Sequence, residues 1–233
     1  MTKFVLVPGA WLGGWVWRKV TPLLEDRGNE VYAVTLTGMG ERVHLASREV
    51  GIETAIRDVL NVLEYNDLDD VVLVGHSFAG KVVAAAADRA PERVRTVLYL
   101  DAYRPEKVRT PQGSFDPNEF VKLDPSEWRV AFTEGMLDNI GKDVRGADRQ
   151  WMLSKATPWP RRLVTEPVTL SERFDSLRSA YVLCTGGGDD VEAVLKEKLD
   201  GPVRVIDSGH WPMITKPEET ADDLLSLARE AVP

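Results

Sequence analysis

The feature that most constrains the fold of this chain is an alternation of short apolar runs with longer segments of helical pattern. The runs are rich in β-branched residues and are expected to form strands at residues 3–7, 30–36, 71–74, 94–100, 178–185 and 203–207. Apolar residues recur at helical spacing at residues 15–27, 52–63, 78–90, 191–199 and 216–231. This alternation predicts an α/β fold with a mainly parallel sheet of about six strands and helices on both faces.

The segment from residue 104 to residue 177 interrupts the alternation. It holds no clear β run, several helix-like pieces, many prolines and three of the seven tryptophans. An insertion between two strands, placed at their carboxyl ends, is where a lid over a functional site is commonly found. We therefore expect a core domain built from residues 1–103 and 178–233, and a helical lid formed by residues 104–177.

The composition indicates one domain with an ordinary polar surface. The chain has 233 residues, of which 43% are hydrophobic, and a net charge of −8. Because no basic patch is present, neither a nucleic acid nor a membrane is an expected partner. The single cysteine, Cys184, excludes an internal disulfide, and no apolar run is long enough to span a bilayer, so we expect a cytoplasmic protein. A homodimer is left open.

The sequence lacks motifs for cofactors. It contains no metal-ligand cluster and no phosphate-binding loop, and the glycines at residues 186–188 lack the G-x-G-x-x-G spacing of a dinucleotide site. We therefore expect neither a metal ion nor an organic cofactor.

The most specific motif is a serine between a predicted strand and a predicted helix. Residues 71–80 read Val-Val-Leu-Val-Gly-His-Ser-Phe-Ala-Gly, with Ser77 at the turn. A strained strand-to-helix turn raises the serine Oγ above the sheet edge, and the helix N-terminus directs N–H groups at a developing oxyanion. Ala79 replaces the second glycine of G-x-S-x-G and adds only a methyl group. The pattern favours a nucleophile over a serine that merely caps the helix.

Only three histidines are available as a base for Ser77. His210 follows the last predicted strand, which is where the chain order serine, acid, histidine places a catalytic base. His76 adjoins Ser77, but its side chain leaves the turn in another direction, so we expect it to pack. His44 is expected to be structural or to lie at the rim of a pocket. His210 is therefore the predicted base.

A glycine-rich turn at residues 8–14 follows the first predicted strand. Such a turn brings a backbone N–H beside the serine and completes an oxyanion hole. The N–H groups of Ala10 and Phe78 are the expected pair.

The chain resembles a group of small α/β hydrolases that contains plant methylesterases, hydroxynitrile lyases and related bacterial esterases. Residues 4–24 match the opening of that group closely, and residues 36–45, 75–80, 98–105 and 209–213 match further along; the lid matches only loosely, around residues 157–167. The resemblance implies an α/β-hydrolase fold. The lyases of the group carry a threonine and a lysine where this chain has Gly9 and Trp211, so the resemblance implies an esterase and not a lyase.

The acid that orients His210 is ambiguous. In the family it follows the penultimate strand, and an ungapped alignment places Gly187 there, with Asp189 and Asp190 shortly after it. Asp189 and Asp190 also suit the N-terminus of the next predicted helix. Asp101 stands at the end of the strand at residues 94–100, a more rigid mount than a triglycine loop, and we favour it. The alternatives are Asp189, Asp190 or no acid.

Aromatic side chains near the catalytic loops indicate the kind of substrate. We expect Trp11, Trp211 and Trp128 to contact it, because such side chains suit an apolar or aromatic group. The chain is therefore predicted to be a serine carboxylesterase or methylesterase that hydrolyses small apolar or aromatic esters through an acyl-enzyme. Two alternatives remain. The first is another enzyme on the same fold, either a carbon–carbon lyase or hydrolase or a biosynthetic cyclase. The second is a ligand-binding relative without turnover.

Overall fold

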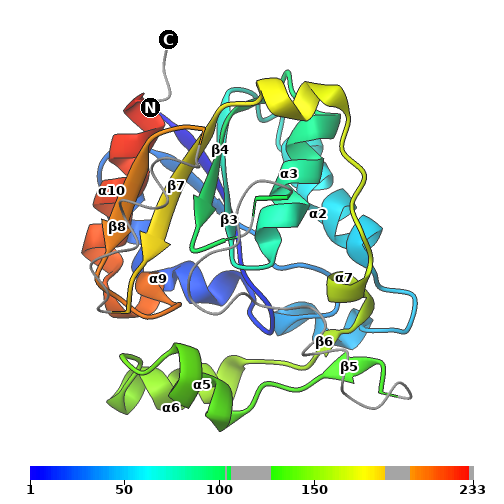
Figure 1. Ribbon diagram of the computed structural model, residues 1–233, viewed down its shortest axis with the longest axis vertical. Helices are drawn as coiled ribbons and strands as arrows, with labels where there is room; N and C mark the ends of the chain where they lie inside the picture. The colour runs from blue at the N-terminus through cyan, green and yellow to red at the C-terminus, as the bar shows by residue number, and fades with distance from the viewer. Residues whose placement is uncertain (103, 106–126, 187–199, 231–233) are drawn as a thin grey trace.

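A six-stranded parallel sheet forms the centre of the molecule, with the strand order β2-β1-β3-β4-β7-β8 (Figure 1). The computed structural model describes residues 1–102, 104–105, 127–186 and 200–230. The strands are β1 (Lys3–Val7), β2 (Glu30–Ala33), β3 (Val71–His76), β4 (Val94–Leu100), β7 (Ser179–Cys184) and β8 (Val203–Ile206). The prediction of an α/β fold with about six mainly parallel strands is confirmed.

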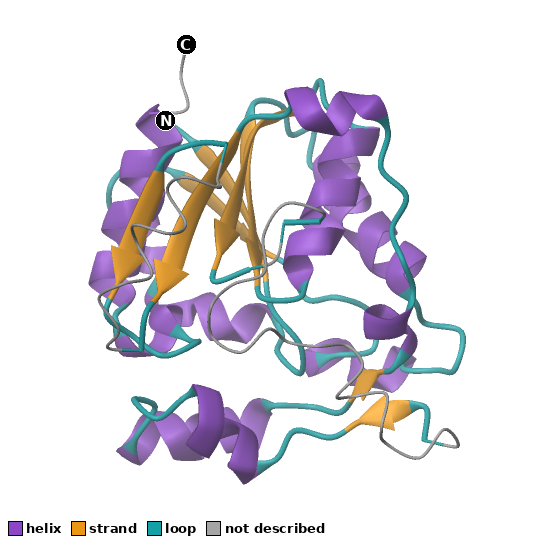
Figure 2. Ribbon diagram, in the orientation of Figure 1, coloured by secondary structure: helices purple, strands orange, loops and turns teal. Residues whose placement is uncertain are grey.

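Both faces of the sheet are buried beneath helices (Figure 2). On β1, Val5 and Val7 pack into one core cluster while Phe4 and Leu6 pack into the other, because successive residues of a strand point to opposite faces. The first face is covered by α2 (Ile52–Tyr65) and α3 (Ala79–Arg89), and the second by η1 (Gly14–Lys19), α1 (Thr21–Glu25) and α10 (Pro217–Glu230). Within the described residues, no helix combines the length and apolar character that crossing a bilayer requires.

The structure corrects some predicted boundaries. The helix expected at residues 15–27 is two short helices, η1 and α1, because Pro22 has no N–H to donate to a continuous helix. The strand expected at residues 30–36 ends at Ala33. The helix expected at residues 191–199 lies outside the described residues.

Between β4 and β7 the chain forms a separate layer beyond the carboxyl ends of the strands (Figure 1). Its described elements are β5 (Arg129–Val130), α5 (Glu134–Ile140), α6 (Gly146–Lys155), β6 (Trp159–Pro160) and α7 (Arg162–Thr165), and we call residues 127–165 the cap. β5 and β6 pair antiparallel, which the sequence did not indicate because two residues carry no alternation. After the cap the chain runs to η3 (Glu172–Ser176), beside α3, and enters β7.

Candidate active site

Ser77 lies at a sharp turn between β3 and α3. Its backbone is left-handed, with φ of 56°, and its N–H donates to the carbonyl of Leu100 over 3.2 Å. The turn depends on Gly75, because a Cβ there would lie 2.5 Å from Val83 Cγ2 and 2.9 Å from the carbonyl oxygen of Ala79. Ala79, which replaces the second glycine of the motif, is fully buried at the start of α3.

His210 joins this serine from the other end of the chain. We call residues 207–211 the base loop; it follows β8 and precedes α9 (Pro212–Thr215). His210 Nε2 lies 2.8 Å from Ser77 Oγ, and His210 Nδ1 lies 2.5 Å from Asp101 Oδ2. An imidazole that donates from Nδ1 to a carboxylate presents a free lone pair at Nε2, which accepts the serine proton.

Asp101 is held at the end of β4 against β7. Its N–H donates to the carbonyl of Val182 over 2.7 Å, and its Oδ1 accepts the N–H of Cys184 over 3.3 Å. The residue is 3% exposed and its backbone is left-handed, with φ of 41°. The structure therefore brings Asp101 to His210, whereas Asp189 and Asp190 lie outside the described residues.

His76 also contacts the base loop, which the sequence did not predict. The residue is fully buried, and its Nε2 donates to the carbonyl of His210 over 2.8 Å. Its Nδ1 has no partner within the described part of the chain. Burial, and the charge of the nearby His210, hold the pKa of His76 well below its usual 6.5. The ring is therefore neutral and does not oppose a positive charge on His210.

The two amides expected to bind an oxyanion come from the residue after Ser77 and from the turn after β1, whose Gly9 lies against Ser77: a Cβ at Gly9 would lie 3.0 Å from Ser77 Cβ. Ala10 follows β1 and Phe78 precedes α3, and both residues are buried. Neither N–H donates to an acceptor within the described residues. Two unpaired N–H groups beside a nucleophile are what an oxyanion hole requires. A Cβ at Gly9 would lie 2.6 Å from His76 Nδ1, so the turn that carries Ala10 packs directly on that ring.

Aromatic rings from the core and the cap meet above these residues. Trp11 lies 5.5 Å from both Phe132 and Trp159, measured between ring centroids. Phe78 lies 4.8 Å from Trp159, and Trp211 lies 6.1 Å from Phe132. We call these five side chains the aromatic cluster. It includes Trp11 and Trp211, two of the three tryptophans expected to contact substrate.

Trp128, the third, has a different environment. Its side chain is half-buried, and the guanidinium carbon of Arg129 lies 4.5 Å from its ring centroid. Its carbonyl accepts the N–H of Arg161. Ring contacts between Trp128 and the aromatic cluster do not occur among the described residues.

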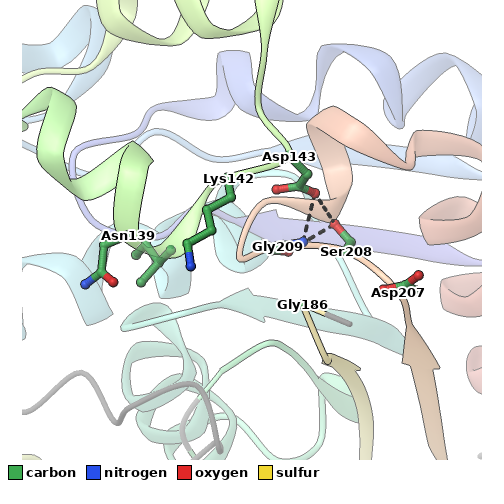
Figure 3. A pocket seen from close by; sticks show the side chains of 8 residues that line it. Asn139, Lys142, Asp143, Gly186, Asp207, Ser208 and Gly209 are labelled. Carbon is green, nitrogen blue, oxygen red and sulfur yellow. Dashed lines mark hydrogen bonds between the residues drawn. The ribbon is translucent and has the colours of Figure 1, made fainter. Parts of the chain in front are cut away.

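A cavity of about 520 Å³ lies beside the base loop (Figure 3). Its wall is formed by the end of α5 and the residues after it, by the base loop and by a residue after β7: Asn139, Ile140, Lys142, Asp143, Asp207, Ser208, Gly209 and Gly186. Ser77 and Asp101 are not part of this wall. Groups of three or more histidine, cysteine or acidic side chains suited to a metal ion do not occur in the part of the chain that the structure describes.

Comparison with known proteins places this geometry in a family. Residues 4–223 match the family model described as "Alpha/beta hydrolase family". The chain is 32% identical over 246 residues to a carbendazim hydrolyzing esterase from Nocardioides sp. (strain SG-4G), which covers 97% of this chain and 100% of that protein. It is 28% identical to methylesterase 9 of Arabidopsis thaliana, over 98% of both chains.

The chain is also similar to a lyase in sequence and to a solved hydrolase in structure. The chain is 32% identical to the alpha-hydroxynitrile lyase of Arabidopsis thaliana, over 97% of both chains. Among solved structures, an extracellular alpha/beta-hydrolase from a Paenibacillus species superposes with a TM-score of 0.82 at 20% identity, covering 98% of this chain and 100% of that one. The relatives are therefore matched over nearly their whole length.

Proposed function

This chain belongs to the alpha/beta hydrolase family, and from that premise we propose that it is a serine carboxylesterase that acts through an acyl-enzyme. The observation that carries the proposal is the chain of contacts from Ser77 Oγ to His210 Nε2 and from His210 Nδ1 to Asp101 Oδ2. These contacts provide a nucleophile, a base and an acid in the order that acyl transfer needs.

In the first half of the reaction Ser77 is acylated. Its Oγ attacks the ester carbonyl while the hydroxyl proton passes to His210 Nε2, and the buried carboxylate of Asp101 stabilises the imidazolium. The N–H groups of Ala10 and Phe78 hold the negative oxygen of the tetrahedral intermediate. The intermediate then collapses: the bond to the alcohol oxygen breaks, His210 returns the proton to that oxygen, and the alcohol leaves.

In the second half water replaces the alcohol. His210 takes a proton from a water molecule, whose oxygen attacks the acyl carbonyl of the Ser77 ester. Collapse of the second tetrahedral intermediate releases the carboxylic acid, and the proton returns from His210 to Ser77 Oγ. The sum is one ester and one water converted into one acid and one alcohol, without a cofactor.

The substrate that we propose is a small ester with an apolar or aromatic group. The aromatic cluster offers such a group a buried, flat-sided surface beside Ser77. We further propose that residues 104–177 act as the lid and that Trp128, on the cap, contacts substrate. One relative is named for hydrolysing carbendazim and another is named a methylesterase, so a methyl ester is the smallest test of this class.

Lyase chemistry is the less favoured alternative, although one relative is a lyase. The threonine hydroxyl of the lyases would have to start from Gly9, where a Cβ would meet His76 Nδ1 at 2.6 Å and Ser77 Cβ at 3.0 Å. Their lysine is replaced by Trp211, which is 1% exposed and carries no charge. These two positions favour an esterase. A cytoplasmic location and a homodimer stay predictions.

The test is hydrolysis of a panel of short-chain and aromatic p-nitrophenyl and methyl esters by the purified protein and by Ser77→Ala. We expect turnover on aromatic or apolar esters that falls by about 10⁵-fold or more in the variant. Ser47→Ala, in an exposed turn, is the matched control and should keep wild-type turnover. Equal, background rates for wild type and Ser77→Ala on every ester would sink the proposal and favour a lyase, a cyclase or a binding protein.

A further inference from the structure

The base loop is held by the cap through three hydrogen bonds. Asp143, between α5 and α6, accepts the N–H of Gly209 at Oδ2 over 2.8 Å, and Ser208 Oγ lies 3.0 Å from the same oxygen (Figure 3). The N–H of His210 itself donates to the carbonyl of Ile140, at the end of α5, over 2.9 Å. Two successive N–H groups of the base loop therefore have their acceptors in the cap and not in the core.

The cap and the core hold His210 from opposite directions. Its carbonyl accepts from His76, which belongs to β3, while its N–H donates to Ile140, which belongs to the cap. The surfaces fit closely at two glycines. A Cβ at Gly209 would lie 2.2 Å from Asp143 Oδ1, and a Cβ at Gly141 would lie 2.3 Å from Cζ3 of Trp211. The base loop therefore packs closely against the end of α5, and we call this contact the joint.

We propose that Asp143 is a positioning residue for His210, so that the cap helps to set the geometry of the catalytic base. This inference rests on the proposed function. Asp143 comes from a segment outside the sheet, yet the hydrogen bonds that the structure describes for its side chain all go to the base loop. Hydrogen bonds to a carboxylate are stronger than those between neutral groups, so these bonds fix the loop firmly.

The joint matters because proton transfer is sensitive to distance. His210 must keep Nε2 near Ser77 Oγ and Nδ1 near Asp101 Oδ2 at once, now at 2.8 Å and 2.5 Å. A displacement of about 1 Å can cost about a hundredfold in rate. The cap is also held to the core by a salt bridge in which Lys19 Nζ lies 2.7 Å from Asp148 Oδ1. Removing the Asp143 contact should therefore loosen the base loop without releasing the cap.

The experiment compares Asp143→Ala, Asp143→Asn and Asp138→Ala. Asn keeps a carbonyl oxygen that can accept from Gly209 and Ser208, whereas Ala keeps none. Asp138 lies on α5, exposed and paired with Arg149, and serves as the matched control. We expect kcat to fall about ten- to hundredfold in Asp143→Ala with KM little changed, and to return to within about threefold of wild type in Asp143→Asn. Asp138→Ala should match wild type.

Two readouts separate positioning from stability and from the esterase proposal itself. The downfield proton resonance of the short His210–Asp101 hydrogen bond should weaken or move in Asp143→Ala and persist in Asp143→Asn, and hydrogen exchange at Gly209 and His210 should quicken. Both are measured without any ester. A lower Tm with unchanged kcat, resonance and exchange would overturn the inference, as would equal losses in Ala and Asn. If the resonance and the exchange rates change in Asp143→Ala but the wild type hydrolyses no ester, the positioning role of Asp143 would be supported and the esterase proposal rejected.

Discussion

Two parts of the site are held in different ways: the sheet edge, with Ser77 and Asp101, and the base loop, with His210. Ser77 and Asp101 end the neighbouring strands β3 and β4, and their N–H groups donate to Leu100 and Val182, so the parallel ladder continues through both. His210 follows β8 in a loop whose backbone is fixed by a buried histidine and by the cap. The sheet thus places the nucleophile and the acid, whereas the base depends on contacts from outside the sheet.

Backbone strain is found on the sheet edge and not on the base loop. Among the described residues, five non-glycine positions have positive φ. Ser77 at 56° and Asp101 at 41° directly follow β3 and β4, Trp11 at 64° lies in the turn after β1, and Asp67 and Asp70 lie between α2 and β3. Each such position costs about 1–3 kcal/mol and persists only where the surroundings enforce it. Parallel strands enforce it here. The difference teaches that the strained positions of the triad lie where parallel strands hold the backbone, while the base loop is held by hydrogen bonds from β3 and from the cap.

After Ser77→Ala, the largest expected effect comes from the acid. Asp101→Asn leaves the sheet mount intact but presents an amide to His210 Nδ1, which favours the wrong tautomer and removes the charge that stabilises the imidazolium. We expect kcat to fall by about 10⁴-fold on the best ester of the panel, with Tm near that of the wild type. Asp138→Asn on the cap surface is the control. Wild-type kcat in Asp101→Asn would move the assignment to Asp189 or Asp190.

A matched pair of glycine substitutions compares the sheet edge, which holds Ser77, with the base loop, which holds His210. Gly75→Ala puts a methyl group against the backbone oxygen of Ala79 and against Val83, in a place that cannot yield, and should lower the free energy of unfolding by about 1–3 kcal/mol. Gly209→Ala meets mainly the side chain of Asp143, with the backbone oxygen of Ile140 at 3.1 Å. Because a side-chain carboxylate can rotate more easily than backbone can shift, stability should change less, by about 1 kcal/mol.

In these two variants, the loss of kcat should not follow the loss of stability. Gly209→Ala pushes the base loop from Asp143, so its kcat should fall more than its stability suggests. Urea unfolding and ester hydrolysis on the same samples measure both quantities. Two variants that lose stability and kcat in equal proportion would remove the distinction between a rigid sheet edge and an adjustable base loop.

The smallest effect concerns pH. The pKa of His76 is lowered by burial, so below its unfolded value of 6.5 the unfolded chain binds a proton that the folded chain excludes. The free energy of unfolding should therefore fall as the pH drops from 7 to 5. His76→Gln removes this titration and should flatten the dependence, while His44→Gln, on the exposed η2 (Gly40–Leu45), should not. Unfolding by urea at each pH is the measurement; an unaltered slope in His76→Gln would contradict it.

The sequence by itself determined the features that local patterns encode. The strands were predicted because apolar, β-branched runs are visible along the chain, and α2, α3, α10 and the six-stranded sheet follow from periodicity. Ser77 and His210 could be named because each sits at a characteristic place relative to a strand. That Trp11 and Trp211 lie near the site followed from their positions in the glycine-rich turn and beside His210, whereas their contact with substrate stays a prediction.

Only the tertiary structure decided which groups meet. Asp101 reaches His210 across 109 residues, and Asp143 reaches Gly209 across 66, and no periodicity or turn signal records such pairs. The direction of the His76 ring, towards the carbonyl of His210, was equally hidden. The physical reason is that side-chain contacts between distant segments depend on strand order and on how the cap docks, and these are properties of the packed chain rather than of any window of sequence.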